Sequence, residues 1–361
     1  MLILPTVSIA VAGRAAWTVV LAAWVVSALG SGAFWLAARR HPEERFPTYV
    51  LRALGPVLGR VALLYLAGVP VLVAAVDLIL IFESVDDVFY DRTPFWALAA
   101  AVLVVAGYAA WTGWRSLAMV SPLLLLAVGA TLSFLWALLV PKAEAGYLWP
   151  PIDPGQFRWE PVAVWLALVG FHYPVVLPFL FPLAARKKRF FPAFAAGGFA
   201  GAAVILVSVL FVVAVVGPEA ARELGQPYPD ITAVLTLPRS FFDRPEHLAR
   251  LSLNVNALMA VAVSLLAGAE MLAALVSARN PDPFIPVVAG GALGVASAAH
   301  EPGLRQPLMA ATGGLLYSAV PLLLLLAVLP ARPARSPRPG PDSRAPTTRR
   351  VHRAAGPFLK T

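Results

Sequence analysis

Long apolar stretches separated by short polar gaps occupy most of this 361-residue chain. A helix needs roughly 20 apolar residues to cross a hydrocarbon core about 30 Å thick. This criterion predicts nine transmembrane helices, at residues 15–38, 58–82, 94–111, 117–140, 161–185, 191–216, 251–278, 283–299 and 308–329. The pattern therefore predicts an all-α polytopic membrane protein.

One further apolar piece, residues 1–12, is too short to cross a bilayer alone. It has neither a basic start nor a small-residue cleavage pattern, so we do not interpret it as a signal peptide. We expect a first helix that lacks its first half, as a start codon assigned too far downstream would produce. The prediction is about ten transmembrane helices, with the first truncated.

Positively charged residues favour one orientation of these helices. If the first fragment runs outward, the inner loops and the C-terminal stretch together hold 19 of the 28 Lys and Arg residues. Because cytoplasmic loops carry an excess of Lys and Arg, both termini are predicted to be cytoplasmic. The net charge of +9 is then a topology signal, and no nucleic-acid partner is expected.

Composition supports a lipid environment and divides the chain in two. Hydrophobic residues make up 60% and charged residues 13% of the chain, which does not suit a water-soluble protein of this size. Residues 1–330 are predicted to form the transmembrane permease-like bundle. Residues 331–361 are rich in Pro, Arg, Ser and Thr and are predicted to be a disordered, basic cytoplasmic tail.

Several classes of chemistry are not expected from the sequence. The absence of cysteine excludes disulfides and thiol nucleophiles. We find no Gly-rich phosphate loop with Lys and Ser/Thr, and the five histidines show no metal-binding spacing. We therefore expect no cofactor, no metal and no enzymatic activity.

Polar residues within the predicted spans are the strongest candidates for function, because a charge in hydrocarbon costs several kcal/mol unless it is paired or hydrated. Asp77 lies about two-thirds along its span. Glu270 lies in span 251–278, with Asn256 fourteen residues before it and so roughly on the same helical face. Either acid is a candidate proton relay or amine ligand, and the alternative is a structural hydrogen bond across the bundle.

The predicted span at residues 161–185 contains an unusual concentration of helix-disrupting residues. They are Gly170, Pro174, Pro178 and Pro182, with Phe171, His172 and Tyr173 between the first two. Proline removes a backbone donor and clashes with the preceding turn, so this helix is expected to bend or unwind near mid-membrane. An unwound helix would expose backbone groups to a small zwitterion, whereas the alternative is a kinked but continuous helix.

A series of short motifs resembles the endospore germination permease family. The resembling positions run in order along the chain, at residues 12–17, 39–42, 49, 54–55, 58–60, 92–94, 108, 113, 178, 186–189, 217–219 and 228–229. Their order and spacing carry the resemblance, which extends over residues 12 to about 235.

The resemblance implies both a fold and a role. Members of that family are B subunits of nutrient germinant receptors in the inner membrane of bacterial spores, and belong to the amino acid, polyamine and organocation transporter superfamily. It implies an inverted five-plus-five helix repeat with discontinuous first and sixth helices. It also implies that a small nutrient, often an amino acid, binds between these helices and the third and eighth, and that A and C subunits receive the signal.

These observations give one leading hypothesis, a non-enzymatic germinant-sensing subunit. Its expected ligand-binding residues are Gly170, Phe171, His172, Tyr173, Asp77 and Ser264, and its expected proton or polar relay residues are Asp77, Asn256 and Glu270. The alternatives are a proton-coupled amino acid transporter, in which Asp77 or Glu270 carries the proton, and a subunit that only scaffolds its partners.

Overall fold

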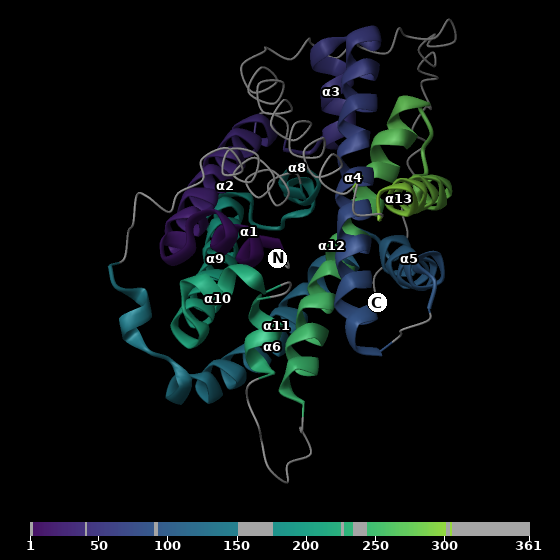
Figure 1. The fold of residues 1–361 in the computed structure, drawn as a ribbon. Helices are drawn as coiled ribbons and strands as arrows, with labels where there is room; N and C mark the ends of the chain where they lie inside the picture. The colour runs from purple at the N-terminus through teal and green to yellow at the C-terminus, as the bar shows by residue number, and fades with distance from the viewer. Residues whose placement is uncertain are drawn as a thin grey trace, which may run out of the picture.

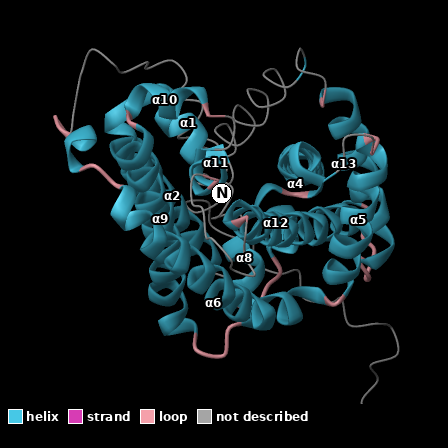
Figure 2. Ribbon diagram, turned by 60° about the horizontal axis from the view of Figure 1, so that its bottom comes forward, coloured by secondary structure: helices cyan, strands magenta, loops and turns pink. Residues whose placement is uncertain are grey.

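The structure is a computed structural model that describes residues 3–39, 42–89, 93–150, 176–224, 227–233, 244–300 and 304. All regular elements among these residues are helices (Figures 1 and 2). Seven of the helices have at least 15 residues: α2 (Ala16–Ala38), α4 (Pro56–Phe89), α5 (Phe95–Trp111), α6 (Gly113–Leu139), α9 (Lys187–Val216), α12 (Pro245–Leu275) and α13 (Ile285–Ala299).

The helices confirm an all-helical polytopic membrane protein. Within the described ranges, 6 helical segments are long and apolar enough to cross a membrane, and α5 is a shorter apolar helix. The long helices coincide with seven of the predicted spans. Residues 161–175 of the predicted sixth span and the whole of span 308–329 lie outside the described residues. The predicted total of about ten helices therefore stays a prediction.

Short elements connect the long helices. The α-helical ones are α1 (Ile3–Ala12), α3 (Phe46–Leu54), α8 (Leu177–Leu180), α10 (Pro218–Glu223) and α11 (Pro227–Thr232). The 3-10 turns are η1 (Gly13–Ala15), η2 (Val140–Lys142), η3 (Ala145–Leu148), η6 (Phe181–Leu183) and η7 (Asp282–Phe284). Helices α4, α10, α11 and α12 each begin at a proline, which suits the first helical turn because its missing N–H has no helical partner there.

The elements pack into two groups, which lie on opposite sides in Figure 1. The α4–α12 group buries an apolar core formed by α3, α4, α5, α8, η6, α12, α13 and the start of α6, to which Phe34 of α2 also belongs. The α2–α9 group buries a second core formed by α1, α2, α9, α10, α11 and the rest of α6. Helix α12 contributes to both, since Ala249 in its first turns is part of the second core. Helices α2, α6 and α12 therefore each contribute to both cores.

Candidate ligand site between α4 and α12

Helices α4 and α12 run antiparallel and pack along most of their lengths. At one end, Arg250 Nη1 donates to the carbonyl oxygen of Ser84 over 3.3 Å. Further along, a Cβ on Gly268 would lie 3.5 Å from Cβ of Pro70. These two contacts fix the register, because residue numbers rise along one helix as they fall along the other.

The register places Asp77 in the interface between the two helices. Asp77 lies seven residues from both Pro70 and Ser84, so all three share one face of α4. Both neighbours contact α12, and Asp77 is only 6% exposed. Asp77 is therefore a buried residue on the α12-facing side of α4, at the middle of the helix pair.

The residues of α12 that face α4 can be derived in the same way. Arg250 and Gly268 are eighteen residues apart, which is five helical turns, so both point toward α4. Ala257 and Val261 are buried on this face and lie level with Asp77, halfway between the two fixed contacts. The α4-facing side of α12 is thus apolar at the level of Asp77.

Polar side chains of α12 lie on both sides of the Asp77 level along the helix axis. Asn254 and Ser264 share the α4-facing side of α12, and each lies about 7–8 Å from the level of Asp77 along the axis. Ser264 is 6% exposed, and the Oδ1 atom of Asn254 is buried without a hydrogen-bond partner among the described residues. A carboxylate, an amide and a hydroxyl in one helix interface can bind the ammonium and carboxylate of a zwitterion. The structure thus brings the candidates Asp77 and Ser264 together and adds Asn254.

The other two relay candidates lie on a different side of α12. Asn256 and Glu270 both point away from the face that contacts α4. Glu270 is also about 16 Å from the level of Asp77 along the axis, by the rise of 1.5 Å per residue. Its Oε1 accepts a hydrogen bond from the indole N–H of Trp114 over 3.0 Å. Asp77 and Glu270 therefore form two separate polar positions.

Trp114 links Glu270 to an aromatic cluster. Its ring stacks on Phe179 of α8 with centroids 5.2 Å apart, and Phe179 meets Phe46 of α3 edge-on at 5.6 Å. The groove beside this cluster has room for about one water molecule. Its lining residues are Ala38, Glu44, Phe46, Tyr49, Pro178, Phe181 and Pro182. It is too small for an amino acid.

The predicted sixth-span wall of the site, Gly170, Phe171, His172 and Tyr173, lies outside the described residues. The described part of that span is α8 and η6, which pack against α2 and the aromatic cluster. The structure therefore defines the α4–α12 half of the candidate site.

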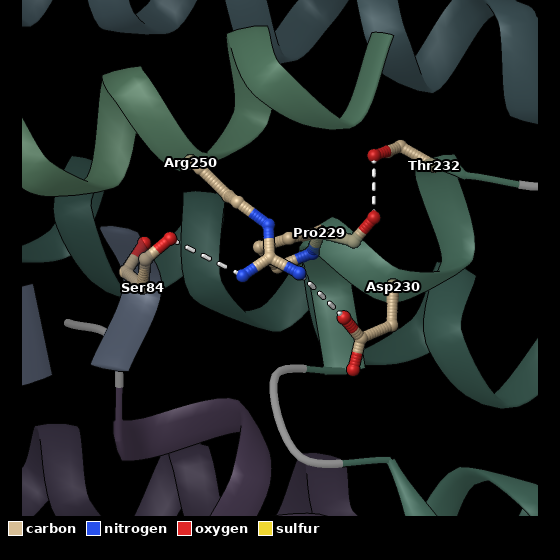
Figure 3. A network of polar contacts seen from close by, with 5 residues as sticks. All are labelled: Ser84, Pro229, Asp230, Thr232 and Arg250. Carbon is tan, nitrogen blue, oxygen red and sulfur yellow. Dashed lines mark hydrogen bonds and ion pairs between the residues drawn. The ribbon is translucent and has the colours of Figure 1, made fainter. Parts of the chain in front are cut away.

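Sequence reasoning missed a polar network at the end of this interface (Figure 3). Arg250 is 8% exposed and, besides its bond to Ser84, donates through Nη2 to Asp230 Oδ1 of α11 over 3.1 Å. Thr232 ends the same short helix with a hydrogen bond from Oγ1 to the Pro229 carbonyl, 2.7 Å long. The sequence showed Arg250 and Asp230 only as charges of a polar gap, twenty residues apart. Their pairing depends on how α11 folds back.

Tyr228, on the same short helix, was noted in the sequence only as part of a family motif. Its ring is 2% exposed in the second core, and burial raises the pKa of its hydroxyl. The phenol thus stays neutral and adds no charge to the second core.

Fold and site together define a polytopic helical membrane protein with polar groups buried between two central helices. The family model described as spore germination protein matches residues 1–298, and the chain belongs to this family. The resemblance seen in the sequence is thereby confirmed, as is a role in germination. A comparison with curated proteins finds no match.

Proposed function

We propose that this protein senses a small nutrient, an amino acid, in a mid-membrane pocket and passes the signal to partner A and C subunits. The observation that carries the proposal is the burial of Asp77 on the α12-facing side of α4, at a level between Asn254 and Ser264. In a spore germination protein, such a site suits a ligand with an ammonium and a carboxylate group. The nutrient acts by binding one conformation of the bundle better than another.

The helix contacts support the inverted repeat that belongs to this proposal. Exchanging α4 with α12 and α5 with α13 maps the pair α4–α13 onto the pair α12–α5, and both pairs are in contact. The same exchange maps the contact between α4 and α5 onto that between α12 and α13. Helices α2 and α9 also contact each other, as expected if they are equivalent. In this arrangement the site lies between α4 and α12, each of which is the third helix of its five-helix repeat. Residues 161–185 form its remaining wall.

The proposed membrane rests on the family, and the proposed orientation rests on the charge distribution. We place the protein in the inner membrane of the spore, with both termini and the tail at residues 331–361 in the cytoplasm. Lys187 at the start of α9 is then on the cytoplasmic side, where it binds Glu43 and the carbonyl oxygen of Pro42. This surface is available to the partner subunits.

The test is a germination dose response with single substitutions. We expect His172→Ala, Tyr173→Ala and Asp77→Asn to raise the nutrient concentration needed for a half-maximal response at unchanged membrane protein level. Thr131→Ala is the matched control, because this hydroxyl is on an exposed side of α6 and bonds only to the Ala127 carbonyl among the described groups. Unchanged dose dependence in all three variants would contradict the proposed pocket.

A second candidate function is proton-coupled amino acid transport. The observation that favours it is the presence of two carboxylates, Asp77 and Glu270, inside membrane-spanning helices. Purified protein in proteoliposomes with an imposed proton gradient separates the two functions. A sensor binds the amino acid without net accumulation, whereas a transporter accumulates it and loses this ability in Asp77→Asn.

A further inference from the structure

Arg250 connects the two packing groups of the protein. Its guanidinium binds Ser84 of α4 and Asp230 of α11, so one side chain of α12 joins three elements (Figure 3). Helix α11 packs against α12 itself, and it connects this end of α12 to the other group because it also packs against α9 and α1 and contributes Tyr228 and Ile231 to the second core. The ion pair thus crosses the boundary between the α4–α12 group and the α2–α9 group.

The pair is buried enough to matter energetically. The Arg250 side chain is 9% exposed and that of Asp230 is 25% exposed. A buried guanidinium that loses its carboxylate partner is destabilised far more than an exposed one. By contrast, Arg222 and Glu219 pair within α10 over 3.4 Å, and the Glu219 side chain is 74% exposed. The Arg250 pair differs from this exposed pair because its guanidinium is buried and joins α12 and α4 to α11.

Its position relates the pair to the candidate site. Ser84 lies seven residues from Asp77 on the same face of α4, which is about 10 Å along the axis. Arg250 lies one turn from Asn254 on the same face of α12. In the predicted orientation this end of the helix pair faces outward. A solute that approaches Asp77 along the interface from outside therefore passes Arg250.

We propose that the Arg250–Asp230 pair is an outer latch that closes α11 over the α4–α12 interface. In the closed state the pair holds the two packing groups together at their outer end. Opening requires that Asp230 leave Arg250 and that α11 move away from Ser84. The assignment of this opening to nutrient entry rests on the proposed function, whereas the latch itself does not.

The absence of cysteine in the chain makes a direct test simple. Ser84→Cys places a nearly isosteric thiol at a fully buried position, and the Ser84 carbonyl remains available to Arg250. The full-length protein is reconstituted in nanodiscs, and its labelling by a membrane-impermeant maleimide is followed over time. The labelling rate of a buried thiol reports the fraction of molecules in which the covering element has opened.

Loss of the latch is expected to raise this rate at least about tenfold, the effect of losing a charged hydrogen bond. Asp230→Asn and Arg250→Ala are each made in the Ser84→Cys protein, and the double variant should label no faster than the faster single variant. Arg222→Ala is the matched control and should leave the rate unchanged. If Arg250→Ala does not insert, Asp230→Asn alone decides the question. Equal rates in the parent and Asp230→Asn proteins, or an equal increase in the control, would overturn the latch.

The assay contains no nutrient, so its result is independent of the proposed function. A second arm repeats the labelling with a mixture of the twenty amino acids. A change in rate that disappears in Asp77→Asn links the latch to the pocket. A latch that opens in Asp230→Asn but does not respond to any amino acid would remove its assigned role in nutrient entry.

Discussion

Gly268 provides a sharp test of the helix packing around the candidate site. A Cβ at this position would lie 3.0 and 3.1 Å from the two methyl groups of Val288 and 3.5 Å from Pro70. Valine has one strongly preferred rotamer in a helix, so Val288 of α13 cannot turn both methyls away. Gly268→Ala therefore forces α12 and α13 apart.

The magnitude follows from two opposing effects. Overpacking a well-packed core by one methyl costs about 1–3 kcal/mol. Replacing a helical glycine by alanine gains about 1 kcal/mol from helix propensity. We expect Gly268→Ala to be destabilised by about 0–2 kcal/mol, and the control Gly290→Ala to be stabilised by about 1 kcal/mol. Gly290 is on the exposed surface of α13, and no described atom lies within 4 Å of the place that an alanine methyl group would occupy there.

The assay compares the thermal midpoints of the detergent-solubilised variants by the monodisperse fraction that remains after heating. Val288→Ala removes both clashing methyl groups, so the double variant with Gly268→Ala should be more stable than the sum of the single effects by about 1–2 kcal/mol. Strict additivity, or a Gly268→Ala midpoint as high as that of Gly290→Ala, would refute the close packing of α12 on α13.

Three further predictions test other parts of the protein. Glu270→Gln keeps the acceptor for Trp114 and should preserve the germination dose response. Trp114→Phe should destabilise the protein by about 1–3 kcal/mol in the thermal assay. A lost response in Glu270→Gln would instead indicate that Glu270 carries a proton. Tyr228→Phe should leave the thermal midpoint unchanged or raise it, because the hydroxyl has no partner among the described residues; a marked loss would reveal a hidden acceptor. Deletion after Pro330 should leave membrane insertion intact, as measured by membrane fractionation, and failed insertion would contradict the disordered tail.

Hydrophobic length predicted the long helices correctly because lipid imposes one strong requirement on every span. The same signal could not predict α3, α10 and α11, whose six to nine residues fall in polar gaps. Asp77 was identifiable because a charge in an apolar run stands out. Its relation to Asn254 was not, since this depends on the antiparallel register of two helices far apart in the sequence. The Arg250–Asp230 pair was missed because it depends on how the short helix α11 folds back onto α12.

The two sides of α12 carry different polar groups, and this limits how the helix can move. Spinning the helix about its own axis by half a turn would carry Glu270 off its indole donor and press a carboxylate against the aliphatic wall of α4. Such a stranded charge costs several kcal/mol. Any functional motion of α12 must consequently be a tilt or a slide, without a large rotation of the helix about its own axis.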